Sequence, residues 1–532
     1  MRGNYMKKIL LLLFLFVGFV NAQNLLKVVD KPKYARGSAI DLDGSTEYMS
    51  KSPPVNLNLN GTERITATDD RTFETTKGTW ADNGNHSAVR STTDKKTGTA
   101  SLAMTSTAVG DVTTNFISLP STSFTALQQD ANSIYEKYTL EMWARGTGIV
   151  SETDLLAGWN FTSGWSTSGP ATISDSNTFV TTALAGIYKT SGNMTIGVTY
   201  KLTISGTVSA GSLNIRDAGT TTIYGIVSGT FNTTIYFVAK HIQLFLQNTT
   251  AATTDIITLT LQAITNPSIT FACGNQTNTI ANISCVPGTF TKLVWNFQAT
   301  ANEINQPIKV YANQADAVYL DDVSLTKAWD AIILTWIKSG NSSTNSGIAG
   351  YGVITTGYNF YFRMDNYNQI IFETSDNAIR QTSINFSWAG YSNNQYHLVA
   401  GYFNHSGTSS LYIDGVSKSS GNTNNLGKIF AATSFIIGQL SSAFFSGQIG
   451  ETQIVRFTDI SQSNVNASTL LNAYKLGIPR TWIGGSPQVV AHYKFKGTTD
   501  AQMLNDISGT GNSLSGTNVA TADKTTGTYP SK

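Results

Sequence analysis

Apolar and polar residues alternate over short segments along most of the chain, which is the pattern of half-buried β-strands. The clearest segments are 396–403 and 411–413, and the second ends at Asp414-Gly415, a pair that favours a tight hairpin turn. Strand patterns follow at 435–438 and 445–455, and the apolar spacing of 464–474 predicts one face of a short helix. The sequence therefore predicts an all-β protein built from antiparallel sheets.

Four motifs in this stretch stand in a recognisable order. They are YHLVAGYF (396–403), LYIDG (411–415), IG (437–438) and FSGQIGE (445–451). Their order and spacing resemble the closing half of laminin-G-like (concanavalin A-like lectin/glucanase) jelly-roll domains. Tyr396-His397 replaces the Trp-His of that pattern, and Gly450-Glu451 replaces its Asp-Glu.

The opening strands of the same domain type lie far upstream. Residues 36–51 (RGSAIDLDGSTEYMSK) resemble those strands, but the Trp-containing strand that usually follows them appears only at 330–338 (DAIILTWIK). We therefore expect a discontinuous laminin-G-like jelly roll, 23–60 with 328–532, interrupted by an inserted segment. Insertion at an exposed loop is inexpensive because the entropy of loop closure grows slowly with length.

The inserted segment contains a second resemblance. TFE (72–74), YTLEMWA (138–144) and YLDDVSL (319–325) resemble carbohydrate-binding-module jelly rolls of the galactose-binding-like type. This domain is expected to comprise 61–145 and 268–327. Short strand patterns between them predict a further small β-sandwich at 146–267, so the expected fold is a set of nested jelly rolls.

Residues 486–532 leave two alternatives. The strand pattern VVAHYKF (489–495) resembles the start of another laminin-G-like unit, but few residues follow it. We expect this segment to complete the preceding sandwich, and the alternative is a partial second unit.

The first residues predict export. Lys7 and Lys8 precede an apolar run, 9–20, and small residues end at Ala22, which is the layout of a secretory signal peptide, 1–22. The run is too short to span a membrane. A secreted or cell-surface protein without a membrane span is expected.

The composition limits the classes of molecule that the protein is expected to bind. Charged residues are 13% of the chain and the net charge is +2, without the clustered basic residues that nucleic acid requires. The two cysteines, Cys273 and Cys285, are expected to form a disulfide after export. The alternative is a metal pair, but no further Cys or clustered His would complete it.

Catalysis has no motif in the sequence. Glycoside hydrolysis needs two carboxylates across a cleft, and Glu141 and Glu373 are lone strand carboxylates that we expect to be solvated. The histidines are scattered, and no phosphate loop or metal-protease motif occurs. A non-enzymatic protein is therefore expected.

Sugar binding has more support. Sugars stack on exposed aromatic rings, and amides and carboxylates bind their hydroxyls. Such combinations are Trp159-Asn160 with Trp165, and Trp388 with Tyr391, in segments rich in Gly and Ser. The mid-strand tryptophans are instead expected to pack in cores: Trp143, Trp295 and Trp336.

The carbohydrate-binding-module resemblance also implies a structural calcium ion. Its ligands would be Glu74 and Asp322, with carbonyl groups of the turn around Gly98. The alternative is that Asp322 caps a turn and Glu74 is solvated.

These features favour an exported, non-catalytic protein that recognises surface or extracellular glycans. The alternative is a structural or adhesive protein of a cell surface or phage virion, whose sandwiches make protein contacts. An enzyme of unfamiliar type is a distant third alternative.

Overall fold

The structure is a computed structural model that describes most of the chain. The described residues are 36–43, 48–51, 57–58, 60–129, 135–339, 345–351, 359–376, 381–423, 425–431, 435–440, 443–457, 487–495, 515–517 and 524–528. The expected signal peptide (1–22) and the expected helix at 464–474 lie outside these residues.

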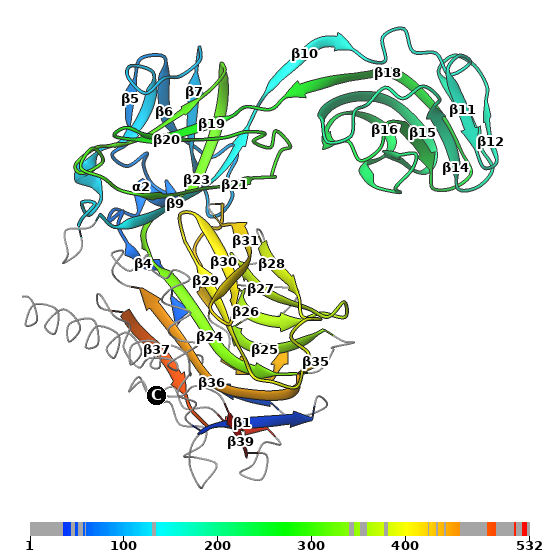
Figure 1. Cartoon of the computed structure of the whole chain (residues 1–532). Helices are drawn as coiled ribbons and strands as arrows, with labels where there is room; N and C mark the ends of the chain where they lie inside the picture. The colour runs from blue at the N-terminus through cyan, green and yellow to red at the C-terminus, as the bar shows by residue number, and fades with distance from the viewer. Residues whose placement is uncertain are drawn as a thin grey trace, which may run out of the picture.

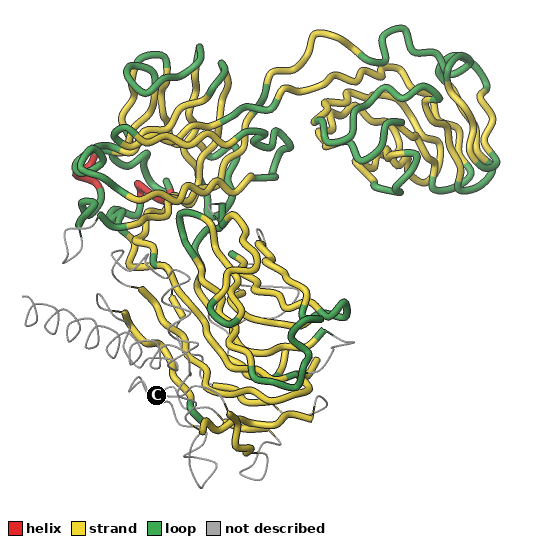
Figure 2. The backbone as a smooth tube through the Cα atoms, viewed as in Figure 1, coloured by secondary structure: helices red, strands yellow, loops and turns green. Residues whose placement is uncertain are grey.

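Strands make up nearly all of the regular structure (Figures 1 and 2). Among the described residues the helical segments are one turn each, α2 (Asp69–Thr72) and the 3-10 turn Ser121–Ser123. The pairings between strands are antiparallel throughout, for example β24 (Asp330–Lys338) with β29 (His397–Phe403). The all-β prediction is confirmed.

The first jelly roll consists of two sheets packed face to face. One sheet has the order β31-β30-β29-β24-β36-β1-β39, with β37 also on β36, and the other has the order β28-β27-β26-β25-β33-β2-β38. The strands of the first sheet are β1 (Arg36–Asp43), β24, β29, β30 (Thr408–Ile413), β31 (Val416–Asn422), β36 (Ser446–Phe457), β37 (Pro487–Tyr493) and β39 (Lys524–Thr528). Those of the second are β2 (Tyr48–Lys51), β25 (Ser346–Tyr351), β26 (Asn359–Met364), β27 (Gln369–Ser375), β28 (Gln381–Ser387), β33 (Phe435–Ile437) and β38 (Ser515–Thr517).

Segments far apart in the sequence meet in these sheets. β1 lies between β36 and β39, with Ile40 opposite Ile449, and β2 lies between β33 and β38. β37 pairs with β36. The N-terminal and C-terminal strands therefore complete the same two sheets. Small two-stranded pairings accompany them: β3 (Leu57–Asn58) with β32 (Phe430–Ala431), and β34 (Gln439–Leu440) with β35 (Ala443–Phe444).

Both faces of the central strand β24 are buried, which accounts for its apolar composition. Ile333 and Ile337 point into the core between the sheets. Leu334 and Trp336 belong to a second buried cluster on the other face of the strand. A strand buried on both faces reads as a continuous apolar run rather than an alternating one.

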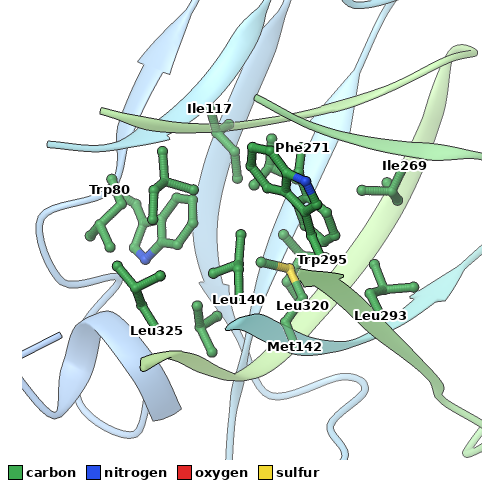
Figure 3. Close-up of a cluster of buried hydrophobic side chains, with 14 of the residues drawn as sticks. Trp80, Ile117, Leu140, Met142, Ile269, Phe271, Leu293, Trp295, Leu320 and Leu325 are labelled. Carbon is green, nitrogen blue, oxygen red and sulfur yellow. The ribbon is translucent and has the colours of Figure 1, made fainter. Parts of the chain in front are cut away.

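The second jelly roll is one curled sheet with the order β20-β19-β22-β8-β5-β6-β7-β23-β9-β21, and β4 pairs with β23. Its strands are β4 (Asn60–Glu63), β5 (Ala81–Asn83), β6 (His86–Ser91), β7 (Ser101–Ser106), β8 (Phe116–Leu119), β9 (Lys137–Gly146), β19 (Ile269–Cys273), β20 (Gln276–Ile280), β21 (Thr291–Gln298), β22 (Ile308–Ala312) and β23 (Asp316–Ala328). Figure 3 shows its core, where Trp80, Phe271 and Trp295 pack against aliphatic side chains of β9 and β23.

The third body lies apart from the other two and is reached by β10 and β18 (Figure 1). Its strands are β10 (Ile149–Asp154), β11 (Trp165–Ser168), β12 (Ala171–Ile173), β13 (Thr178–Thr181), β14 (Ala185–Lys189), β15 (Thr199–Asp217), β16 (Ile223–Val238), β17 (Leu244–Asn248) and β18 (Ala252–Thr265). β15 pairs with β16 along one edge and with both β17 and β18 along the other, so it belongs to both layers of the sandwich.

A buried polar network joins the first and second jelly rolls. The Lys137 ammonium, at the start of β9, lies 2.8 Å from the carboxylate of Asp330 at the start of β24, and both side chains are buried. Asp330 also accepts hydrogen bonds from the Tyr402 hydroxyl (2.7 Å) and the His405 backbone N–H (2.9 Å). Burial lowers the pKa of His405 to about 3, so this ring is neutral at physiological pH and bonds to the Thr139 hydroxyl.

Other contacts of the junction extend the network. The Lys292 ammonium lies 3.3 Å from carboxylates of both Glu141 and Asp376. The Asn296 amide donates to the Leu426 carbonyl at 2.7 Å. Polar groups of both domains therefore pair with each other inside this junction.

The predicted disulfide is wrong in this structure: Cys273 and Cys285 are both free and buried. Cys273 ends β19, and the chain returns along β20 with Ile280 opposite Ile269. Cys285 follows beyond that end, where the Ile283 N–H bonds to the Pro267 carbonyl. The two thiols are thus at opposite ends of a hairpin, and a strand advances about 3.3 Å per residue, which is too far for a disulfide.

Candidate functional site

Trp388 and Tyr391 occupy the loop between β28 and β29, where the edges of the two sheets of the first jelly roll meet. The backbone N–H of Trp388 donates to the Asn368 carbonyl (2.8 Å), and that of Tyr391 donates to the Trp388 carbonyl (2.7 Å). The two rings are 5.5 Å apart, so the predicted pair is brought together. The indole is fully buried in the core. The prediction that the Trp388 ring stacks on a sugar is therefore wrong.

Tyr391 is the ring of this pair that reaches the surface. It is half-buried and meets Phe386 edge to face at 6.3 Å. The Lys418 ammonium, from β31, lies 5.5 Å from the Tyr391 ring centroid and 5.8 Å from that of Phe386. An aromatic surface with a cation at its rim results, formed by residues of three separate segments.

Polar side chains surround this surface. His397 is fixed by Asp414, 2.7 Å from its Nδ1, and by the Asn393 side-chain oxygen, 3.0 Å from its Nε2. The Asn385 amide donates to the Gln369 side-chain oxygen at 2.8 Å, but Asn385 alternates along β28 with the core-facing Ile384 and Phe386, so this pair lies on the other face of the sheet. A cation beside a half-open ring can hold sugar hydroxyl or carboxylate groups. We call Phe386, Tyr391 and Lys418 the Tyr391 site.

Trp159, Asn160 and Trp165 form a separate cluster in the third body. Trp165 is buried, and its ring meets Phe161 edge to face at 5.1 Å, so it is a core side chain rather than a contact surface. The Asn160 side-chain oxygen accepts hydrogen bonds from the Thr162 N–H and hydroxyl, which closes a local turn. Trp159 is half-buried against Phe161 and is the ring of this cluster that remains partly open.

The three tryptophans that were predicted to lie in cores differ in burial. Trp295 and Trp336 are buried, as predicted. Trp143 is half-buried and has the Lys96 ammonium 4.4 Å from its ring, so the prediction of core packing is wrong for this residue.

The strand carboxylates Glu141 and Glu373 are not solvated, contrary to the sequence prediction. Glu141 pairs with Lys292 at the domain junction. Glu373 is buried, pairs with Arg363 at 3.3 Å and accepts a hydrogen bond from the Tyr361 hydroxyl. Burial and this neighbouring carboxylate raise the pKa of Tyr361 far above its usual range. Both carboxylates are therefore held in structural ion pairs.

The residues expected to bind calcium meet at one turn. Glu74 accepts hydrogen bonds from the Thr99 N–H and hydroxyl, and one of its oxygens lies where a side chain at Gly98 would be. Asp322 accepts a hydrogen bond from the Thr97 hydroxyl at 2.9 Å. Glycine at position 98 thus leaves room for the Glu74 carboxylate beside the turn.

Asp321, which the sequence analysis did not single out, is the more deeply buried neighbour. Its carboxylate accepts the backbone N–H groups of Lys96 (2.9 Å) and Thr97 (3.1 Å). Burial raises the pKa of Asp321 to about 6, and the charge of Asp322 adds to the effect. Within the part of the chain that the structure describes, no basic side chain pairs with this carboxylate, so its ionised form would be stabilised by a bound cation.

The donor set is compatible with calcium, which prefers carboxylate and carbonyl oxygens. The described residues contain no group of three or more His, Cys, Asp or Glu side chains that could hold a metal ion. Carbonyl oxygens of the turn would therefore have to complete the coordination.

Comparison with known proteins finds similarity over part of the chain. No curated protein sequence matches it significantly. Among solved structures, the binding domain of botulinum neurotoxin serotype D matches with a TM-score of 0.20 and 18% identity, covering 24% of this chain and 31% of that one. The same type of domain in complex with N-acetylneuraminic acid has a TM-score of 0.20 and 19% identity, covering 24% and 31%.

A third match is the binding domain of Paraclostridial Mosquitocidal Protein 1, with a TM-score of 0.21 and 14% identity, covering 27% of this chain and 36% of that one. The chain spans about a third of the length of each of these proteins. No helix among the described residues has the length and apolar character needed to cross a bilayer. Residues 312–465 match the family model of the concanavalin A-like lectin/glucanase superfamily, which confirms the laminin-G-like resemblance over that stretch.

Proposed function

We propose that this chain is an exported, non-catalytic protein that binds glycans at the Tyr391 site of its first jelly roll. The observation that carries the proposal is the half-open Tyr391 ring, backed by Phe386 and rimmed by Lys418. The match of residues 312–465 to the concanavalin A-like lectin/glucanase superfamily supports the same class of ligand. The ring would stack on the C–H face of a sugar, and Lys418 would bind its hydroxyl or carboxylate groups.

Binding rather than catalysis is supported by the state of the strand carboxylates. Glu141 and Glu373 are engaged in ion pairs with Lys292 and Arg363. A general acid or nucleophile for glycoside cleavage must instead reach the substrate.

Replacement of Tyr391 by alanine should weaken binding to the recognised glycan about tenfold, equivalent to about 1.4 kcal/mol, because the stacking surface is lost. The matched control is Tyr188→Ala. Tyr188 is also half-buried and also meets a phenylalanine, Phe245, edge to face at 6.3 Å, but it lies in the third body. Isothermal titration with the glycan measures both variants. Equal affinities for the two variants would refute the assignment of the site.

Trp159 is the second candidate ring, because it is half-open in a loop of the third body. Loss of affinity in Trp159→Ala, with Tyr391→Ala unchanged, would move the glycan site to that body.

We also propose that calcium binds at the turn 94–99, held by Asp321, Glu74 or Asp322 and by turn carbonyls. Bound calcium would neutralise the buried charge of Asp321 and fix the turn. Calcium should raise the melting temperature of the wild-type chain relative to chelator, and Asp321→Asn should abolish this increase. The matched control is Asp82→Asn, since Asp82 lies on a neighbouring strand and its ion pair with Lys77 is exposed.

The pH dependence follows from the Asp321 pKa of about 6. Because this folded-state pKa exceeds the ordinary value of 3.8, the group stabilises the chelated protein fully below pH 3.8, and this contribution is lost as pH rises through 6. Calcium competes with the proton, so stabilisation by calcium should be large above pH 6 and should disappear below it. Calcium stabilisation that is unchanged between pH 5 and pH 8 would contradict the assignment of Asp321.

A structural or adhesive surface protein is the second candidate function. The buried Lys137–Asp330 junction favours it, because rigid coupling of domains suits a load-bearing or scaffolding role. A folded protein that binds no glycan would favour this candidate.

A further inference from the structure

β16 is an edge strand of unusual length. It runs for 16 residues and pairs with β15 from end to end, with Val238 opposite Thr199 and Ile223 opposite Arg216. No other strand among the described residues pairs with it. A typical strand has five or six residues, so this sandwich presents a long row of backbone groups for pairing.

This edge lacks two of the features that usually block association. Its sequence, IYGIVSGTFNTTIYFV, contains no charged residue and no proline. Ile223 and Ile226 are 47% and 62% exposed. By contrast, the edge strand β31 of the first jelly roll has seven residues and carries Lys418. Natural edges are normally protected by lysine, proline, bulges or short length. The register of β15 with β16 shifts twice, but it is continuous where Thr199–Val208 pairs with Gly229–Val238.

The second half of the strand is suited to pair with a copy of itself. Gly229 has a positive φ of 58°, which separates 223–228 from the nine residues 230–238. Along this half Phe231 and Phe237 point into the core, whereas Asn232 and Thr234 are exposed. Antiparallel pairing about Thr234 would place Thr234 opposite Thr234, Asn232 opposite Tyr236, and Phe231 opposite Phe237.

The Phe231–Phe237 pair is aromatic and the Thr234–Thr234 pair is β-branched, which are favourable combinations in antiparallel sheets, and Asn232 would lie opposite the Tyr236 ring. The absence of charge permits pairing with a second copy. A charged edge would place like charges together when it met its own copy, but this uncharged strand meets its copy without repulsion.

We propose that two copies of this chain associate through antiparallel pairing of residues 230–238 of β16 about a two-fold axis at Thr234. The dimer would join two third-body sandwiches into continuous sheets and would hold two Tyr391 sites in one particle. Two linked sites raise the apparent affinity for a repeating glycan without any new contact.

Cross-linking tests the register directly. Across an antiparallel pair, facing Cα atoms are about 4.5–5.5 Å apart, within the range that a disulfide bridges. Thr234→Cys should therefore form a covalent dimer under mild oxidation. Thr260→Cys is the matched control, since Thr260 points out from the same face but lies on β18, two strands from the edge. Burial raises the pKa of both native thiols to about 12, so Cys273 and Cys285 should not react.

Sedimentation velocity tests the association itself. The wild-type chain should shift from the mass of one chain to twice that mass as its concentration rises through the micromolar range. Thr234→Lys should weaken the dimer about tenfold or more, because it places two ammonium groups opposite each other, and Thr260→Lys should not. Far-UV circular dichroism verifies that both variants are folded.

A wild-type chain that remains monomeric throughout this range would overturn the proposal. So would a dimer that Thr234→Lys leaves unchanged, or a Thr234→Cys variant that cross-links no faster than Thr260→Cys.

Discussion

Replacement of Lys137 by methionine should lower the free energy of unfolding by about 3–5 kcal/mol. The substitution removes the cation of a buried ion pair and leaves the Asp330 carboxylate in the junction between the first and second jelly rolls. An uncompensated buried charge is far more costly than a broken surface pair. Urea denaturation followed by tryptophan fluorescence measures the change.

The matched control is Lys77→Met. The Lys77 ammonium lies 3.1 Å from the Asp82 carboxylate, but both side chains are more than a third exposed. An exposed pair of this kind contributes about 0–1 kcal/mol. If the two substitutions had equal effects, the buried network would not couple the domains as described.

A double variant refines the test. Lys137→Met with Asp330→Leu removes both charges, so the large penalty should decrease. Recovery should be incomplete, because the Tyr402 hydroxyl and the His405 N–H lose the acceptor that Asp330 provides.

Replacement of Trp388 by alanine should destabilise the first jelly roll by about 3–5 kcal/mol, the usual effect of removing a large buried aromatic side chain. The indole is fully buried between the sheets, and the cavity left behind would be lined by rigid strands. Urea denaturation again measures the loss. Trp159→Ala is the control, since Trp159 is half-buried in a loop and its removal leaves a smaller cavity.

This comparison separates a core role from a ligand role. A Trp388→Ala variant as stable as the wild type, with glycan binding reduced, would show that the ring serves the ligand rather than the core.

The strand pattern of the sequence predicts much of the fold. In each half-buried strand, apolar residues that face the core alternate with polar residues that face solvent, so the strand can be recognised from its own sequence. The segments 36–51 and 330–338 are recognisable for this reason, although they join one sandwich only in the folded chain, where β1 and β24 pair with opposite sides of β36. The apolar run of β24 is consistent with burial on both faces.

The candidate site is less visible in the sequence. Trp388 and Tyr391 share the same loop, yet one ring points into the core and the other toward the surface. Lys418 reaches Tyr391 only because the edges of β28 and β31 meet. The composition of the loop predicts neither the directions of the two rings nor the approach of Lys418.

The residues of the proposed calcium site show a similar limit. Strand alternation would normally distinguish Asp321 from Asp322, but the pairing of β23 with β9 shifts register between Asp321 and Ser324. Asp322 also has a positive φ of 50°. A break in the strand of this kind removes the period on which the assignment of buried positions depends.

The buried polar network between the first and second jelly rolls is also not predictable from the sequence. Lys137 and Asp330 are separated by 193 positions. Asp330 begins the recognised strand 330–338 and Lys137 precedes the motif 138–144, but neither pattern relates the two residues to each other. Their pairing follows from how two domains dock, which no single-strand pattern records.

The most direct test of the proposed function is an array of neutral and acidic polysaccharides probed with residues 23–532. We expect saturable binding to one class of sugar that is lost in Tyr391→Ala and retained in Tyr188→Ala. A folded protein that binds nothing on the array, or that binds equally well without the Tyr391 ring, would contradict the account.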